Sequence, residues 1–341
     1  MRVSRLVCIA AGVAASAAML SACTLPSAQG GPARDDIVPP VVTSAHHASW
    51  MEPRTSGEDL LYVTNGNGIV NVYTYSQQEL VGELINFTDP KGECTDAKGD
   101  VYITDYGADQ IDEYAHGGTS PLRVIDESGY KPYNCAIDPK TGDLAVANYT
   151  GDGYESEGNL AIYARAKGKP TYYSNADLYY LNACGYDKFG DLLATGFTLF
   201  SGTFLYTAFA YLPAKSKDFA EIALPPPDSS FGWDGVEVQG IGWDGKYWAV
   251  EPSEHLYEYS INIKPELVGS VELEGADSPI AFYGAAAKKQ ATQAIGSDGF
   301  SGSDDVYYWS YPAGGEPLVK ITHGLDHPFG VAISLGKVAI R

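Results

Sequence analysis

Four polar residues stand at or just before the starts of successive apolar runs in the sequence: Glu93, Asn134, Asn182 and Gln239. Carboxylate and amide oxygens are the ligands that hard cations such as Ca²⁺ prefer in proteins. If the following runs converge on one axis, these side chains converge with them, and the pattern predicts a calcium-type site. The alternative is that the four side chains only satisfy backbone groups where strands begin.

The apolar runs belong to a repeat of about 40–50 residues that extends from about Gly92 to the C-terminus. Its clearest copy places an Asp-x-x-Gly-Asp turn before Val101–Asp105, and the next copy places Asn134–Asn148 in the same pattern. Each copy holds three or four short runs with an alternation of period two, separated by Gly, Asp, Asn and Pro. Outside the N-terminal region we find no apolar stripe of helical period. The repeat therefore predicts an all-β protein.

A four-stranded antiparallel sheet repeated at this length is the blade of a β-propeller. We expect the innermost strands near Cys94, Cys135, Cys184, Gly240, Ile280 and Gly330. We expect the second strands at Val101–Thr104, Leu144–Ala147, Leu192–Thr195, Tyr247–Val250, Ala291–Ile295 and Val338–Ile340. Six inner strands predict six blades, with the ring closed by pairing of the N- and C-terminal segments, because the segment from Leu60 has no inner strand of its own. Val338–Ile340 duplicates the role of Leu60–Val63, so seven blades is the alternative.

The runs Asp96–Asp105 and Leu61-Tyr-Val-Thr-Asn65 resemble the repeats of NHL-type and YVTN-type propellers. This resemblance covers residues 58–341 and implies the propeller fold. Members of such families serve as binding platforms, scaffolds and, less often, enzymes, so the resemblance does not select a function.

The N-terminus has the features of a bacterial lipoprotein signal. Arg2 and Arg5 precede an apolar run, which ends in Leu20-Ser-Ala-Cys23. The run is too short to span a membrane and ends in small residues. We expect residues 1–22 to be a signal peptide and Cys23 to be the lipidated first residue. Residues 23–57, rich in Pro, Ala, Gly and Ser, would be a flexible tether, and 58–341 the propeller.

This arrangement predicts an extracytoplasmic protein that is anchored to the cell envelope by lipid. Thr24, rather than Asp, follows the cysteine, which favours the outer membrane in a Gram-negative cell. The chain carries 43 acidic and 22 basic residues, a net charge of −21. This charge argues against binding nucleic acid and against adhesion to anionic headgroups.

Three cysteines lie in the expected propeller, on the inner strands of successive repeats. Cys135 and Cys184 share a register, three residues before an Asp, whereas Cys94 stands two residues before its Asp. Three buried free cysteines is one interpretation, and a Cys135–Cys184 disulfide in an oxidising compartment is the other.

Aromatic residues beside Gly-rich connections suit contact with a protein or a carbohydrate. The connection from Pro225 to Asp234 is the longest irregular segment and is our candidate for an exposed recognition loop. The candidate ligand-binding residues are Phe231, Trp233, Tyr149 and Tyr154. We interpret the aromatics on third strands, such as Tyr73 and Tyr308, as packing between sheets.

Common catalytic and phosphate-binding motifs are absent from the sequence. The segment Gly92-Glu93-Cys94-x-Asp96 loosely resembles the first-blade motif of the regucalcin/gluconolactonase family, and this resemblance implies a metal-dependent lactonase. The sequence as a whole favours a lipid-anchored envelope propeller that binds a protein or carbohydrate ligand and is not an enzyme. A metal-dependent lactone or ester hydrolase with Ca²⁺ in the central channel, and a structural subunit of an envelope complex, are the alternatives.

Overall fold

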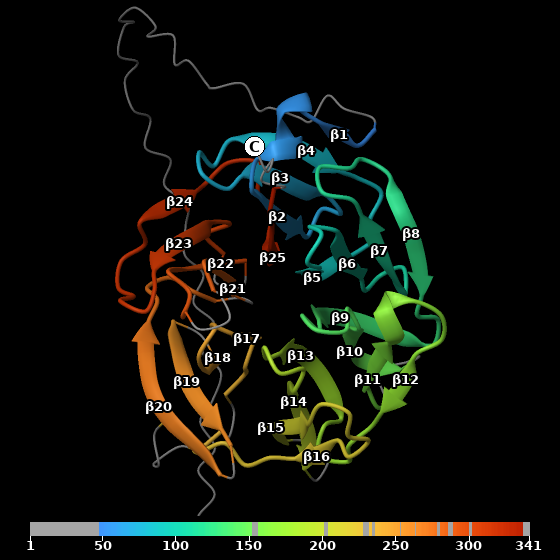
Figure 1. Ribbon diagram of the computed structural model, residues 1–341, viewed down its shortest axis with the longest axis vertical. Coiled ribbons are helices and arrows are strands. Elements are labelled where there is room, and N and C mark those ends of the chain that lie inside the picture. The colour runs from blue at the N-terminus through green and yellow to red at the C-terminus, as the bar shows by residue number, and fades with distance from the viewer. Residues whose placement is uncertain are drawn as a thin grey trace, which may run out of the picture. The chain divides into compact units, whose positions relative to one another are not determined.

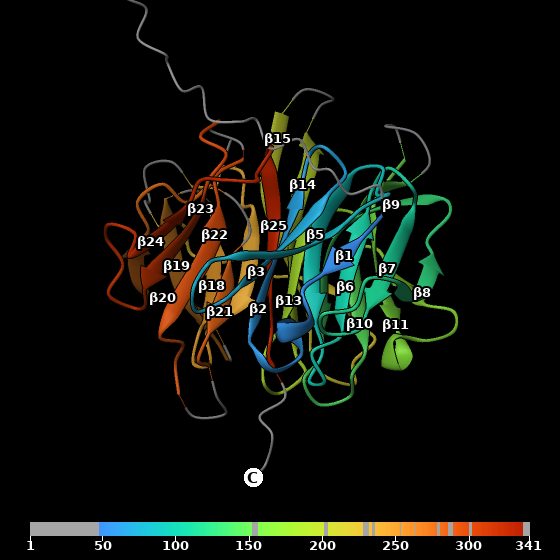
Figure 2. The same cartoon turned by 90° about the horizontal axis from the view of Figure 1, so that it is seen from above.

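The computed structural model describes residues 48–151, 156–200, 204–227, 232–233, 236–252, 254–262, 264–277, 280–285, 289–299 and 302–336. They form six sheets arranged in a ring around a central axis, an all-β six-bladed propeller (Figure 1). In the view turned by 90°, the ring is seen edge-on and its strands run between the two faces (Figure 2). No helix in these ranges is long and apolar enough to cross a membrane.

We number the blades in chain order and give their strands from the axis outward. Blade 1 has five strands: β25 (Pro328–Ser334), β2 (Leu60–Asn65), β3 (Val70–Thr74), β4 (Leu80–Leu84) and β1 (Trp50–Met51). Blade 2 contains β5 (Pro90–Thr95), β6 (Val101–Asp105), β7 (Gln110–Tyr114) and β8 (Pro121–Asp126). Blade 3 contains β9 (Tyr130–Ile137), β10 (Leu144–Gly151), β11 (Asn159–Tyr163) and β12 (Thr171–Tyr173).

The remaining blades follow the same order. Blade 4 contains β13 (Tyr180–Tyr186), β14 (Leu192–Phe200), β15 (Phe204–Leu212) and β16 (Ala220–Glu221). Blade 5 contains β17 (Gly240–Trp243), β18 (Trp248–Glu251), β19 (His255–Ile261) and β20 (Pro265–Glu272). Blade 6 contains β21 (Ala281–Tyr283), β22 (Gln293–Ser297), β23 (Val306–Ser310) and β24 (Val319–Ile321). Two short 3₁₀ segments complete the described elements, η1 (Pro53–Gly57) and η2 (Ala164–Ala166).

The ring closes within blade 1, where the two ends of the chain meet. β25 supplies the inner strand and pairs antiparallel with β2, with Leu61 opposite Ile333 and Val63 opposite Val331. The predicted closure and the six blades are therefore confirmed. The segment 338–340, which raised the seven-bladed alternative, lies outside the described residues.

Blade 1 begins earlier than the sequence indicated, because β1 and η1 lie in the stretch assigned to the tether. β1 pairs with β4, and the Trp50 indole donates a hydrogen bond to Glu83 (Nε1–Oε2 2.9 Å). Met51 packs over Gly82, where a Cβ atom would approach its Sδ to 2.3 Å. A two-residue strand is too short to show an alternation of period two. The sequence pattern therefore does not predict β1.

In blades 2 and 4 the Asp-x-x-Gly-Asp segment is the turn from the inner strand to the second strand. In blade 2 the Asp96 carboxylate accepts the backbone N–H groups of Lys98 and Asp100 (2.8 and 3.0 Å). Asp187 accepts from the corresponding two residues of blade 4. The glycine adopts positive φ in both turns, as at Gly99 (φ +87°), where an L side chain is strained. These requirements explain why the turn recurs in the sequence.

The Asn or Asp at the end of the second strand holds the segment that leads into the inner strand. The Asp105 carboxylate accepts the N–H groups of Thr88 and Asp89, both at 2.8 Å. Asn65 Oδ1 accepts the N–H of Asp326 before β25 (3.0 Å). In blades 1 and 2, the Asn or Asp that ends the second strand therefore holds the backbone just before the inner strand.

Aromatic side chains of the third strands fill the spaces between neighbouring blades, as the sequence predicted. Tyr73, Tyr163, Tyr259, Tyr308 and Trp309 are at most 1% exposed. Tyr73 and Tyr308 share one apolar cluster with residues of blades 1 and 6. Packing of this kind between sheets holds adjacent blades together.

Candidate functional site

The six inner strands surround a channel with a cavity of about 240 Å³. Residues of β5, β9, β13, β17, β21 and β25 all contribute to its lining, and Glu93 and Asn134 are the predicted ligands among them. Convergence of the inner strands on one axis is thus as the sequence led us to expect. Asn182 and Gln239 are buried but are not part of this lining.

Glu93 is the most unusual group in the channel. It is 7% exposed, and neither carboxylate oxygen has a hydrogen-bond partner among the described residues. Burial raises the pKa of Glu93 well above its ordinary value, because a charged carboxylate loses its hydration there. The neutral acid is therefore favoured in this site unless a ligand or a cation supplies compensation.

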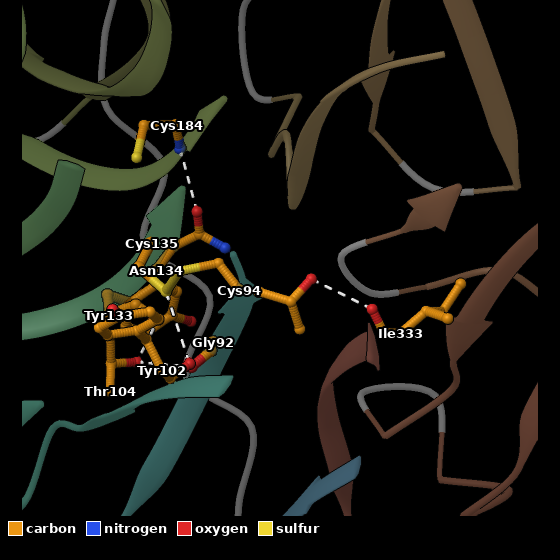
Figure 3. The surroundings of a disulfide bond; sticks show 10 residues. Gly92, Cys94, Tyr102, Thr104, Tyr133, Asn134, Cys135, Cys184 and Ile333 are labelled. Atoms are coloured by element: carbon orange, nitrogen blue, oxygen red, sulfur yellow. Dashed lines mark hydrogen bonds between the residues drawn. A yellow bond between two sulfur atoms is a disulfide. The ribbon is translucent and has the colours of Figure 1, made fainter. Parts of the chain in front are cut away.

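The amide residues differ in how well they are satisfied. Asn134 Oδ1 accepts the backbone N–H of Cys184 on the next inner strand (3.2 Å; Figure 3). Asn182 donates its amide to the Val238 carbonyl, but its Oδ1 has no partner in the described structure. Gln239 Oε1 also has no partner there. Asn134 thus fits the alternative that these polar side chains only satisfy backbone groups. Asn182 and Gln239 each keep one buried acceptor oxygen without a partner among the described residues.

A second buried carboxyl that the sequence analysis missed lies at the end of β18. Glu251 is 1% exposed, and both its oxygens lack partners among the described residues. Burial is the main cause that raises its pKa, and Asp277 adds to the shift. Glu251 pairs with Gly240 across the sheet, as Asp105 pairs with Pro90. Comparison of the residues that end the second strands would have singled it out.

The described residues contain no group of three or more His, Cys, Asp or Glu side chains placed to hold a metal ion. Of the four predicted ligands, only Glu93 and Asn134 line one cavity, and the Asn134 oxygen already accepts a hydrogen bond. The donor set therefore does not fit a calcium site as it stands, and we derive no catalytic step through a metal. The metal site remains a prediction.

The disulfide of the propeller joins Cys94 and Cys135, with a Cα–Cα distance of 5.6 Å, and Cys184 is a free buried thiol (Figure 3). The interpretation as three free cysteines and the alternative Cys135–Cys184 pair are therefore both wrong. Residues that share a register on successive inner strands point toward the same side of the ring and cannot meet. Cys94 has the opposite register and faces Cys135 across the seam of blades 2 and 3, whereas Cys184 packs against blade 3 from blade 4.

A continuous group of aromatic rings lies where the inner strands of neighbouring blades begin. Tyr133 and Tyr149 of blade 3 stack at 5.1 Å, and Tyr149 stacks on Tyr180 of blade 4 at 4.9 Å. Phe329 of blade 1 meets Tyr133 edge to face at 5.1 Å. We call the group the tyrosine array; its members are Tyr106, Tyr133, Tyr149, Tyr179, Tyr180 and Phe329.

The tyrosine array is both accessible and close to the channel. Its five tyrosines are partly exposed. Tyr133 directly precedes Asn134, which lines the channel cavity. Most members belong to strands of the scaffold, so their rings are held in place more firmly than side chains on loops.

Charged side chains border the tyrosine array on two sides. Lys91 lies over the Phe329 ring (5.2 Å) and pairs with Asp89 (2.8 Å). Lys131 lies over the Tyr106 ring at 5.7 Å. Burial, together with the nearby Glu237 carboxylate, raises the pKa of Tyr149 to about 12. Burial and the Glu237 carboxylate therefore keep the Tyr149 hydroxyl protonated at neutral pH, so it can act as a hydrogen-bond donor.

Among the four predicted ligand-binding residues, only Tyr149 belongs to this array. Trp233 instead donates its indole N–H to the Leu224 carbonyl (3.0 Å) and packs edge to face on Phe209 (5.0 Å), which makes it a packing residue of its connection. Phe231 and Tyr154 lie outside the described residues. The sequence did hold a pattern that indicates the other members: an aromatic residue stands immediately before Asn134 and before Gly330.

No protein-family model matches the chain, and a search of curated proteins finds no relative. The fold is similar to solved structures. A chain of the nidogen/laminin complex is 12% identical with a TM-score of 0.61, covering 82% of this chain and 100% of that one. A chain of Kuenenia stuttgartiensis hydrazine synthase is 17% identical with a TM-score of 0.55, covering 78% and 83%. A protein of unknown function from Bacteroides caccae is 11% identical with a TM-score of 0.52, covering 81% and 99%. At these identities the likeness defines the class of fold, a six-bladed propeller, and no activity.

Proposed function

We propose that the protein is a binding module of the cell envelope whose ligand, a protein or a carbohydrate, contacts the tyrosine array. The array is the observation that carries this proposal, because its six aromatic rings meet across four blades and its five tyrosines are partly exposed. Tyrosine combines a large apolar surface with a hydroxyl donor, and partly exposed aromatic residues of this kind are enriched in binding interfaces.

The proposed location rests on two features. The Leu20-Ser-Ala-Cys23 motif suits lipid attachment at Cys23. The Cys94–Cys135 disulfide suits an oxidising compartment, since such bonds are rare in the cytosol. A structural subunit of an envelope complex remains an alternative, and it differs in requiring a partner that co-purifies in stoichiometric amount.

We expect Tyr149→Ala to weaken ligand binding at least tenfold, since truncation of a central aromatic residue in an interface typically costs about 2 kcal/mol or more. Tyr149→Phe, which keeps the stacked ring, should lose much less. Tyr172→Ala is the matched control, because Tyr172 is an exposed tyrosine of β12 outside the array. Binding is measured on panels of immobilised oligosaccharides and peptides. A ligand that binds Tyr149→Ala and the native protein equally would contradict the proposal.

We expect Cys23→Ser to abolish the incorporation of labelled palmitate and to release the protein from the membrane fraction. The physical reason is that acyl chains supply about 0.8 kcal/mol per buried methylene, and the acidic domain supplies no attraction to an anionic surface. Cys8→Ser, within the expected signal peptide, is the control. Labelling that persists in Cys23→Ser would refute the lipoprotein assignment.

A further inference from the structure

A groove with a volume of about 810 Å³ runs along the seam between blades 2 and 3, away from the tyrosine array. It is bounded by the turns that follow β5 and β9, by β8, and by the loop that contains η2. The side chains of this groove play no part in the function proposed above. They differ from the rest of the molecule in charge, in backbone conformation and in exposed apolar surface.

The groove is basic on a strongly acidic protein. The chain as a whole has 43 acidic and 22 basic residues. The groove reverses this proportion, with five basic residues against three acidic ones: Lys98, Arg123, Lys140, Arg165 and Lys167 against Asp96, Glu113 and Asp138.

The three acidic groups of the groove are already occupied by internal donors. Asp96 and Asp138 accept backbone N–H groups of their own turns. Glu113 accepts both Nε and Nη2 of Arg123. The acidic side chains therefore do not neutralise the cations on the far wall of the groove.

The loop after β11 presents two of those cations in an uncommon backbone conformation. Arg165 and Ala166 both have φ of +52°, in the left-handed region that L residues seldom adopt. Ala166 is 2% exposed and packs in the core, while the Arg165 N–H donates to Asp143 Oδ1 (2.7 Å). Arg165 and Lys167 are exposed on either side of it, and neither side chain has an ion pair with any residue the structure describes. Strained backbone is common at binding sites, and here it holds the Arg165 and Lys167 charges without an ion pair among the described residues, which points to a ligand.

The opposite wall of the groove is the outer strand of blade 2. β8 is the edge of its sheet, so half of its backbone N–H and C=O groups point away from the blade. Its Leu122 and Val124 side chains are 59% and 49% exposed. An unprotected edge with exposed apolar side chains is the surface on which an extended peptide adds a strand.

We propose that this groove binds an extended acidic segment of a protein partner. The segment pairs with the edge of β8, its apolar side chains cover Leu122 and Val124, and its carboxylates meet Arg165 and Lys167. Arginine suits this role because its guanidinium can hold a carboxylate through two parallel hydrogen bonds. Polysaccharides, nucleic acids and lipid headgroups lack the regular amide ladder that an edge strand requires.

The test uses the full chain in detergent and a fluorescein-labelled heptapeptide of alternating Glu and Val. We expect saturable binding at low salt that weakens as salt is raised. Arg165→Glu/Lys167→Glu should weaken it at least tenfold, and Leu122→Lys severalfold. Lys215→Glu/Lys217→Glu, an exposed pair in the β15–β16 connection, makes the same change of net charge and should leave binding unchanged. Melting temperatures confirm that each variant is folded.

Three results would overturn the proposal. Equal weakening by the control pair would mean that only the overall charge matters. Unchanged binding of a peptide N-methylated at alternate residues would exclude strand pairing. Tighter binding of alginate, a carboxylated polysaccharide, than of the peptide would assign the groove to a carbohydrate instead.

Discussion

Glu93→Gln is expected to make the protein more stable than the native chain at neutral pH, although it removes an ionisable group. Glutamine has the shape of the protonated acid, and the native carboxyl is buried without a partner among the described residues. At pH values near 4.5 or below, both chains carry a neutral group at this position and should be about equally stable. The difference therefore depends on pH, and its sign follows from the raised pKa of Glu93.

The folded chain keeps the Glu93 proton at pH values at which the unfolded chain has released it. The unfolded state thus binds fewer protons, and the free energy of unfolding falls as pH rises from the ordinary glutamate value of 4.5 toward the raised pKa. Within this window the native chain should lose about 1.4 kcal/mol per pH unit relative to Glu93→Gln. Urea unfolding at several pH values measures this, with the exposed Glu272→Gln as control.

A calcium ion bound at Glu93 would reverse the expected effect of Glu93→Gln on stability. If the channel holds a cation, Glu93→Gln removes a ligand and lowers the melting temperature, and a chelator lowers that of the native protein only. The same variant then decides the hydrolase alternative, because hydrolysis of a lactone panel must disappear with the cation site. Stabilisation by Glu93→Gln, without an effect of chelator, would rule out a metal-dependent site at Glu93.

The repeat was readable in the sequence because its turns and strand ends have strict backbone requirements. Asp96 must accept two N–H groups, Gly99 must adopt positive φ, and Asp105 must hold the segment before β5. Each requirement restricts the residue type; the first two recur in blade 4 at Asp187 and Gly190, and the third recurs in blade 1 at Asn65. Six blades and closure through β2 and β25 follow from the number and order of these units. The strand β1 was missed because its two residues are held by Trp50 and Met51 side chains rather than by any repeated pattern.

The candidate sites were harder to predict because they depend on which side of a blade each residue faces. Glu93 and Asn134 lie beside the channel as expected, but Asn182 turns toward Val238. The tyrosine array arises from residues 106, 133, 149, 179, 180 and 329, most of which are far apart in the sequence and are brought together by the ring. The same geometry explains the disulfide: two residues bridge adjacent blades only when their registers are opposite.

Cys135→Ala is expected to lower the free energy of unfolding by about 4 kcal/mol, the chain-entropy value for a cross-link between residues separated by 41 positions. The effect is large because β5 and β9 are inner strands of different blades, so the bond limits how far the two blades separate in the unfolded chain. Cys184→Ala serves as the control. It removes a buried thiol that belongs to no cross-link, and we expect a loss of about 1 kcal/mol.

Peptide mapping without reduction tests the pairing independently of stability. Trypsin should release residues 92–98 linked to residues 124–140, and residues 168–188 should carry a free thiol. A link between the second and third of these peptides would restore the Cys135–Cys184 pair and contradict the opposite-register explanation.

A comparison of variants separates the bond from its side chains. If Cys94→Ala, Cys135→Ala and the double variant all lose the same stability, the bond itself, rather than either side chain, holds blades 2 and 3 together. Because the basic groove lies between the same two blades, reduction should weaken acidic-peptide binding along with stability.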